Sequence, residues 1–234
     1  MDDLKLNTAG KKRVLTEVAY YFLLSLIGIT IISLIFQPPN ETLRQAASAL
    51  LFFTVAFYAL RKERIDRAGI GLKFKPVLFS LLAAAAAAII VFPIFSAGFH
   101  LYFSIHHGYD FTAAKSVSAL SKNPSWWAAF AAAQVFLVGL PEEVLYRGYI
   151  QGRLNQFFDR RFTLFGARFG MSLFIASALF ALGHFLLEPV PGRLAVFFPS
   201  LLFGYLRERT GALTAPVVFH GLSNVLLEFL YRGL

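Results

Sequence analysis

The sequence predicts an all-α protein, a polytopic transmembrane bundle of about seven helices. Of its 234 residues, 57% are hydrophobic and only 15% are charged, and the mean hydropathy is +0.63. These values lie outside the usual range of soluble domains. The apolar residues are grouped into long runs, and about 20 apolar residues are needed to cross a bilayer as a helix. Residues 1–234 therefore form a single integral membrane domain in this interpretation.

Seven apolar segments are expected to be membrane helices. The fourth is long because Pro141 interrupts it without ending the helical pattern, and the sixth is short enough to cross only part of the bilayer, so the count lies between six and eight. The alanine run Ala83–Ala88 is expected to pack closely against another helix. The segments are 14–36, 43–60, 76–99, 125–154, 171–187, 194–206 and 212–231.

Lysine and arginine are distributed unevenly between the two sides of these segments. One side holds 17 of the 22, including Lys5 and, on the helix that leads there, Arg147. Cytoplasmic loops are rich in Lys and Arg, so we expect a cytoplasmic N terminus and an exported C terminus. The expected location is a prokaryotic cell membrane. The first apolar run is expected to be a retained anchor. The net charge of +9 fits this topology, and nucleic-acid binding is not expected.

Three smaller features are assigned from their position. Trp126 and Trp127 suit an aromatic belt at the interface opposite the basic side. His100, His106 and His107 are expected in a loop after the third segment, as solvated side chains or, alternatively, as a surface metal site. The chain has no cysteine, which excludes disulfides, thiolate nucleophiles and Cys-ligated metals.

Two adjacent carboxylates, Glu142 and Glu143, lie within the fourth apolar segment. A charge at that depth costs about 2.5 to 3.5 kcal/mol on insertion scales, which makes the pair a candidate functional site. Glu143 and Arg147 are four residues apart and share a helical face, whereas Glu142 points about a third of a turn away. One carboxylate can then be anchored while the other works; the alternative is a purely structural network. Pro141 lacks an N–H and is expected to start a new helical turn, with the glutamates at its positive end.

Three further polar residues interrupt later apolar segments: His184, His220 and Asn224. His220 and Asn224 are four apart and share a face, so both can direct donors to one point. Counted from the predicted basic ends of their helices, Glu142, His184 and His220 lie 11 to 13 residues in, roughly 17 to 20 Å deep. Three helices therefore bring polar groups to one level of the bilayer.

The known signatures of hydrolases narrow the chemistry. No His-Glu-x-x-His zinc motif, Gly-x-Ser-x-Gly elbow or Gly-x-Gly-Asp aspartyl motif occurs in the sequence. What remains is a glutamate base with histidines. Such a set can activate water and hold an oxyanion, which amide hydrolysis requires.

These residues also carry a resemblance to a family. The motifs resemble, in order, those of the CAAX-protease and bacteriocin-processing family of intramembrane endopeptidases, also called Abi or type II CAAX prenyl endopeptidase-like. The resemblance covers about 125–225, which is the expected catalytic core. The matching stretches are Glu142-Glu143-x-x-x-Arg147, Phe180-x-x-x-His184, Arg209-Thr-Gly-Ala-Leu and His220-x-x-x-Asn224.

The resemblance implies a role for each site residue. Glu142, helped by His184, would activate the water, and His220 with Asn224 would stabilise the oxyanion. Glu143 and Arg147 would be the supporting pair. The substrate would be a membrane-associated protein or peptide, carrying a prenylated C terminus, a leader peptide or a C-terminal sorting tail. The resemblance leaves the cofactor open between none and a divalent metal such as zinc.

Two other functions compete with an endopeptidase. A proton-coupled transporter would use Glu142 and the histidines as a relay, but transporters usually show internal repeats with matching broken helices, and the sequence shows no such pairing. A non-catalytic membrane scaffold would have no use for intact motifs at one depth. The endopeptidase is therefore the favoured interpretation.

Overall fold

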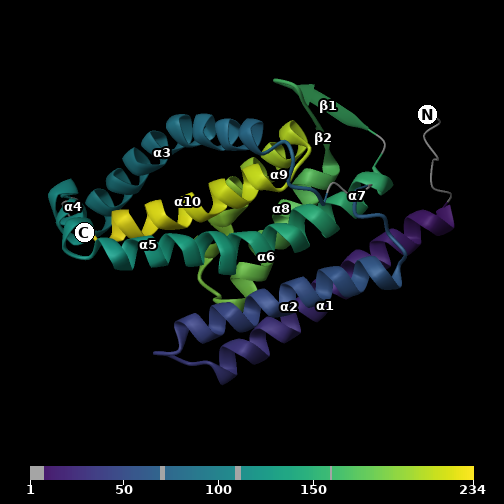
Figure 1. Cartoon of the computed structure of the whole chain (residues 1–234), viewed down its shortest axis with the longest axis horizontal. Coiled ribbons are helices and arrows are strands. Elements are labelled where there is room, and N and C mark those ends of the chain that lie inside the picture. The colour runs from purple at the N-terminus through teal and green to yellow at the C-terminus, as the bar shows by residue number, and fades with distance from the viewer. Residues whose placement is uncertain (1–7, 69–71, 109–111, 159) are drawn as a thin grey trace.

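The computed structural model describes residues 8–68, 72–108, 112–158 and 160–234, and it is a bundle of helices with one small β-hairpin (Figure 1). Within these residues, 4 helices are long and apolar enough to cross a membrane. The predicted all-α membrane bundle is confirmed. The four spans lie in α1 (Thr8–Ile35), α2 (Glu41–Lys62), α3 (Val77–His107) and the continuous helix Pro124–Phe157.

The last three predicted segments are shorter helices. Residues 171–187 form the apolar helix α8 (Met171–Leu187), and residues 212–231 form most of α10 (Thr214–Tyr231). The segment predicted at 194–206 is a 3-10 stretch, η3 (Pro191–Val196), followed by α9 (Phe197–Thr210). How many of these three cross the bilayer stays a prediction.

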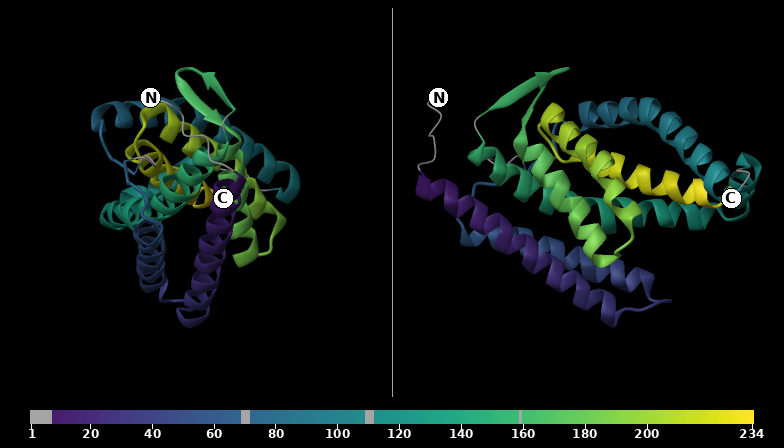
Figure 2. Two further views of the ribbon diagram at one scale, coloured as in Figure 1. Left: turned by 90° about the vertical axis from the view of Figure 1, so that its right-hand side faces the viewer. Right: turned by 180° about the vertical axis from the view of Figure 1, so that it is seen from behind.

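The helices are arranged in two groups (Figures 1 and 2). α1 and α2 pack against each other as one antiparallel pair. In the other group α10 lies between α3 and the long helix that begins at Pro124, while α8 packs against α9. α1 begins at one end of the long axis and the chain ends at the other. α10 is thus in a position to bring its polar residues against the long helix.

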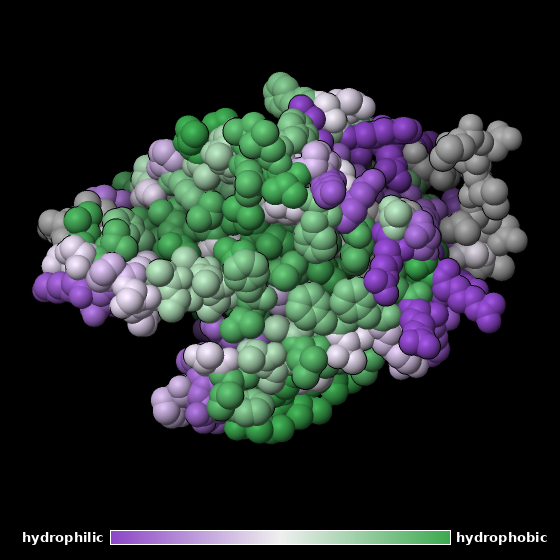
Figure 3. Space-filling model, in the orientation of Figure 1, coloured by the Kyte–Doolittle hydropathy of each residue, from purple (hydrophilic) through white to green (hydrophobic). Residues whose placement is uncertain are grey.

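The surface is apolar where a bilayer would surround it. Large side chains such as Leu78, Ile89 and Ile94 on α3 are mostly exposed, and Figure 3 shows a broad hydrophobic belt with hydrophilic residues gathered mainly at one end. In lipid such outward apolar faces are expected, because tails and apolar side chains are alike. Ala84 is fully buried, with Ala83 and Ala87 beside it, against the cluster that contains Phe203 and Phe219.

Several details differ from the sequence-based expectations. α3 continues to His107, so His100, His106 and His107 lie on its final turns; it ends at Gly108, which takes the left-handed conformation (φ 65°) that glycine tolerates. Trp127 is buried against Phe229, whereas Trp126 is 41% exposed; their place in an interfacial belt stays a prediction.

Two other expectations concern the basic side. Arg147, which was counted there, is fully buried inside the bundle. Lys5 lies outside the described residues.

The hairpin of β1 (Arg161–Leu164) and β2 (Ala167–Gly170) was not predicted, because strands of 4 residues are too short to show a pattern.

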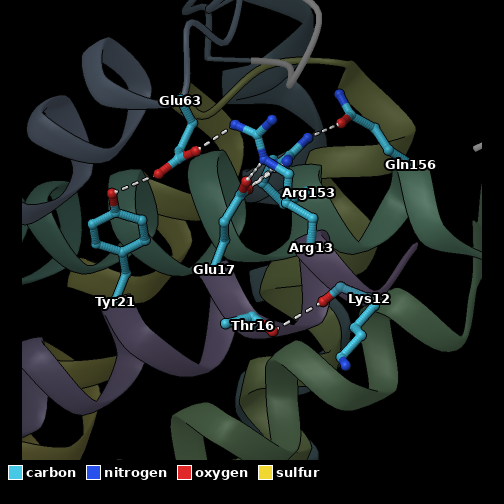
Figure 4. A network of polar contacts seen from close by, with 8 residues as sticks. All are labelled: Lys12, Arg13, Thr16, Glu17, Tyr21, Glu63, Arg153 and Gln156. Carbon is cyan, nitrogen blue, oxygen red and sulfur yellow. Dashed lines mark hydrogen bonds and ion pairs between the residues drawn. The ribbon is translucent and has the colours of Figure 1, made fainter. Parts of the chain in front are cut away.

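An ionic network ties the α1–α2 pair to the rest of the protein (Figure 4). Arg13 Nε lies 2.7 Å from Glu17 Oε1, and Arg13 Nη2 lies 2.7 Å from Glu63 Oε2, just after α2. Glu17 also accepts from Arg153 Nε at 3.0 Å, on α7 (Gln151–Phe157) at the end of the long helix. Tyr21 donates to Glu63 at 3.2 Å. The network therefore links three separate helices at the basic end.

Candidate active site

The long helix Pro124–Phe157 changes its winding around the two glutamates. Two π-helical stretches, η1 (Gln134–Gly139) and η2 (Val144–Ile150), flank the four-residue α6 (Leu140–Glu143), and α5 (Pro124–Ala133) precedes them. Pro141 lies in the first turn of α6, where its missing N–H is tolerated. The helix thus continues through the proline, and π-helical turns of this kind often accompany functional sites.

Two glycines allow the long helix and α10 to approach closely. A Cβ on Gly139 would lie 3.1 Å from the Val217 carbonyl oxygen, and a Cβ on Gly221 would lie 2.5 Å from Val135 Cγ2. Small residues at such a crossing let two membrane helices pack backbone to backbone. Because Gly221 follows His220 and Gly139 comes just before Pro141, this contact brings His220 to the glutamates.

The His220 imidazole lies between the two carboxylates. Its Nδ1 is 2.9 Å from Glu143 Oε1, and its Nε2 is 3.9 Å from Glu142 Oε2. Since a carboxylate accepts, Nδ1–H is the donor to Glu143, and Nε2 faces Glu142. The ring is buried and stacks on Phe203, with 4.6 Å between ring centroids. Both glutamates are therefore in reach of one histidine.

Glu143 and Arg147 form a fully buried pair, as their spacing predicts. Arg147 Nε lies 3.2 Å from Glu143 Oε2. Arg147 Nη2 donates to the Ser200 hydroxyl at 2.7 Å and to the Ser200 carbonyl at 3.1 Å. The guanidinium also lies over the rings of Phe180 and Phe203, at 4.6 and 5.1 Å from their centroids. Glu143 is thus held by both His220 and Arg147.

Glu142 is the less constrained of the two carboxylates. Its side chain keeps 15% of its exposure, whereas the side chain of Glu143 has none. Glu142 Oε2 is buried and makes no hydrogen bond within the described part of the chain. A carboxylate that is partly accessible and has free acceptor capacity can receive a water molecule.

His184 is oriented by its own helix. Its Nδ1 is 2.9 Å from the Phe180 carbonyl, and because a carbonyl can only accept, Nδ1 carries the proton. In the neutral ring Nε2 is then left as the acceptor. The Phe180 ring contacts the His184 ring at 4.5 Å and the His220 ring at 5.8 Å between centroids. Phe180 therefore joins the two histidines, a role that spacing alone could not reveal.

Asn224 makes an interhelical hydrogen bond, which is the alternative to an oxyanion role for an asparagine in a membrane helix. Its side-chain amide donates to Gln134 Oε1 at 2.9 Å, across the interface between α10 and η1. Gln134 is a buried polar residue in an apolar segment, and that pattern is the signal that could have identified it. Asn224 thus lies one turn from His220 with one donor already committed.

The arrangement does not offer a ready metal centre. Across residues 8–68, 72–108, 112–158 and 160–234, no three His, Asp or Glu side chains are placed to hold a metal ion. Three protein ligands are usual for a catalytic zinc. We therefore derive no catalytic step through a metal.

Comparison with known proteins bears on the same segment. Residues 124–226 match the family model described as type II CAAX prenyl endopeptidase Rce1-like. No curated protein and no solved structure matches the chain. The matched residues run from the first turn of α5 into α10 and include Glu142, His184, His220 and Asn224. The resemblance seen in the motifs is confirmed for this segment, which matches the CAAX-protease family model.

Proposed function

We propose that the protein hydrolyses a peptide bond of a membrane-associated protein or peptide, with Glu142 activating the attacking water. The position of His220 carries the proposal. Its Nδ1 is 2.9 Å from Glu143, which Arg147 also holds, while its Nε2 faces the partly accessible Glu142. Because Glu143 is held by two partners and Glu142 is not, we assign Glu143 a structural role and Glu142 the catalytic role.

The proton transfers follow from these positions. Glu142 takes a proton from water as the oxygen attacks the carbonyl carbon of the peptide bond, and later delivers it to the leaving amine. In this proposal the unprotonated Nε2 of His184 accepts a hydrogen bond from the same water. The result is a tetrahedral intermediate with a negative oxygen, which needs donors in place before it forms.

His220 is suited to be one of those donors. If both of its nitrogens carry protons, Nδ1 donates to Glu143 and Nε2 is free to donate to the oxyanion. The charges of Glu142, Glu143, Arg147 and the imidazolium then sum to zero, which a medium of low dielectric favours. Asn224 is the second candidate donor, because its amide carries two N–H groups and only one is bonded to Gln134.

The experiment compares cells that carry the wild-type protein with cells that carry Glu142→Gln. We expect membrane proteins that are cleaved by the wild type to stay intact with the variant, and the corresponding peptides to be absent, while the variant accumulates normally. His184→Ala is expected to behave like Glu142→Gln. His220→Ala should also abolish cleavage, but it should accumulate less well, because it removes the donor to the buried Glu143 carboxylate. Quantitative mass spectrometry of membrane proteins and released peptides measures the outcome.

Glu143→Gln is the matched control for the same experiment. Removing one partner of a buried pair typically costs about 3 to 5 kcal/mol, so this variant should accumulate poorly and melt at a lower temperature. A Glu142→Gln variant with full activity would refute the assignment of the base. If Glu142→Gln lost as much stability as Glu143→Gln, the assignment of a catalytic role to Glu142 and a structural role to Glu143 would be refuted.

A further inference from the structure

The β1–β2 hairpin exposes an unusual amount of apolar surface. Phe162 is 65% exposed, Leu164 49% and Phe165, at the tip, 84%. Opposite them, Ala167 is buried and Phe169 packs against Tyr205 on α9, so the side chains of the second strand contact the bundle while these three apolar side chains are exposed. In Figure 1 the hairpin projects from the helices. The apolar edge of β1, consisting of Phe162, Leu164 and Phe165, therefore lacks cover from the described chain.

The tip holds Phe165 in a backbone conformation that does not suit it. Leu164 pairs with Ala167, so Phe165 and Gly166 form a two-residue turn, and both have positive φ, 45° and 79°. Such turns favour Asn, Asp or Gly at both central positions, and a bulky residue there is strained. A strained and exposed phenylalanine gains nothing inside the protein, which suggests that its ring is buried by something else.

The surroundings of the tip identify the depth at which it lies. Arg209 passes beneath the turn, with its Cζ 3.3 Å from where a Cβ of Gly166 would be, and lies over the Phe79 ring at 4.9 Å from the centroid. Phe79 is in the first turn of α3, a membrane span that begins at Val77. The tip therefore lies beside the first turn of a candidate span, where we expect hydrocarbon to meet the headgroups.

Arginines lie in or beside the described part of the hairpin. Arg160 comes directly before β1. Arg168 is the cross-strand partner of Thr163, on the face of the hairpin opposite Phe162 and Leu164. Arg160 and Arg168 are both exposed. Together with Arg209 they place three positive charges beside the apolar edge. Figure 3 shows hydrophilic residues on the side of the hairpin toward the basic end and apolar surface on the other side. Apolar side chains next to arginines are typical of segments that lie in the interface of an anionic membrane.

We propose that the β1–β2 hairpin is an interfacial lipid anchor. Phe162, Leu164 and Phe165 enter the boundary between acyl chains and headgroups beside α3, and the arginines contact the phosphates of anionic phospholipids. β2 leads directly into α8, which carries His184, and the Tyr205 hydroxyl donates to the Leu164 carbonyl at 3.1 Å. The anchor therefore fixes the depth of both α8 and α9 in the bilayer.

Depth-dependent quenching of tryptophan fluorescence tests the anchor without using activity. Phe165→Trp is made in a Trp126→Phe, Trp127→Phe background, which removes both native tryptophans, and is reconstituted in vesicles of phosphatidylglycerol and phosphatidylcholine. We expect strong quenching by lipids brominated near the headgroup, weaker quenching by lipids brominated deep in the chain, and little quenching by acrylamide in the water.

Two further variants calibrate the measurement. Ile89→Trp, on the exposed face of α3, should be quenched most by the deep bromines, and Gln156→Trp, exposed at the basic end, should be quenched by acrylamide. If the probe at 165 behaves like that at 156, the anchor is refuted. If it is shielded from both lipid and acrylamide, a protein covers the tip, and the proposal is equally refuted.

The role of the arginines has its own comparison. Arg160→Gln with Arg168→Gln should move the probe at 165 toward the water in vesicles that contain phosphatidylglycerol, and should leave it unchanged in pure phosphatidylcholine. If the probe at 165 had the same depth in both kinds of vesicle, with or without the two arginine substitutions, the contact with anionic lipid would be refuted.

Discussion

Asn224 has two candidate roles, and its hydrogen bond to Gln134 makes them separable. As an oxyanion donor it would act on turnover, and losing such a donor typically lowers kcat by about 10² to 10³. As an interhelical bond it would act on stability, by only about 0.6 kcal/mol on average in membranes. We expect Asn224→Ala to fold, to keep a near-normal KM and to turn over at least about a hundredfold more slowly.

Gln134→Ala is the matched control for Asn224→Ala. It removes the same 2.9 Å hydrogen bond but leaves the amide of Asn224 in place. The kcat of Gln134→Ala should therefore fall much less than that of Asn224→Ala, while the melting temperatures of the two variants should fall by similar amounts. If both variants melted at a lower temperature than the wild type but had the same kcat as each other, Asn224 would have no role in the active site.

The sequence singled out most residues of the candidate site because charged and imidazole groups are conspicuous in apolar segments. Glu143 and Arg147 pair as their spacing of four predicts. It could not show that His220 contacts both glutamates, since that depends on how closely two helices approach. The contacts made by Phe180 were equally hidden, because a phenylalanine in an apolar helix gives no signal of its own.

Among the elements, the contact between η1 and α10 is the most sensitive to a small change. A methyl group on Gly221 would meet Val135 Cγ2 at 2.5 Å and Val135 Cα at 3.0 Å. We expect Gly221→Ala to push α10 away, to destabilise the protein by about 1 to 3 kcal/mol and to abolish activity, because His220 moves with α10. Thermal unfolding and a cleavage assay measure the two effects.

Gly98→Ala provides the comparison. Gly98 lies in α3, and nothing is within 4 Å of a Cβ placed there. Alanine is favoured over glycine inside a helix by roughly 0.5 to 1 kcal/mol, so this variant should be as stable as the wild type or more so. If Gly221→Ala were equally harmless, the close packing would not be what positions His220.

The network between α1, the end of α2 and α7 should make stability depend on pH. The hydrogen bond from Arg13 lowers the pKa of the Glu63 carboxyl below its ordinary value of 4.5. Because the pKa is lower in the folded state, the stabilisation is complete above the unfolded pKa and disappears as the pH falls through the folded pKa. We expect the melting temperature of the wild type to exceed that of Glu63→Gln at neutral pH, with the difference shrinking below about pH 4.5. A constant difference at all pH values would contradict this role.

The elements themselves were largely predictable, since all seven apolar segments are helical. Their ends were less so. α3 continues to His107 and ends at Gly108, whereas the predicted segment ended at residue 99. The prediction was too short because the run of apolar residues becomes less regular before the helix ends. The π-helical stretches around Glu142 and Glu143 could not be foreseen, because winding is decided by how side chains pack against other helices.

For the whole molecule, the basic residues predict its orientation in the membrane. The end of α2 and the end of the chain lie at opposite ends of the long axis (Figure 1). We expect a reporter inserted within Arg61–Arg67 to be cytoplasmic and one fused after Leu234 to be exported. Alkaline phosphatase and fluorescent-protein fusions measure this. A cytoplasmic reporter after Leu234 would refute the seven-span topology, and with it the common depth of Glu142, His184 and His220.

For the whole molecule, the class of protein was predictable because 57% of the residues are hydrophobic and they are grouped into runs long enough to cross a bilayer. The β1–β2 hairpin was missed because its strands are only 4 residues long. The pairing of α1 with α2 is typical of neighbouring helices, but the ion pair between Glu17 and Arg153 that joins α1 to α7 connects residues far apart in the sequence.

The alternation of α and π winding gives the long helix a rotational phase. Each residue of an α-helix turns the chain by about 100°, so deleting one residue from η1 would rotate Trp126 and Trp127 by about that angle relative to Glu142 and Glu143. α10 contacts both parts of the helix, through Phe229 near the tryptophans and through His220 at the glutamates, and cannot follow both. The number of residues between Trp127 and Glu142 is therefore as fixed as their identity.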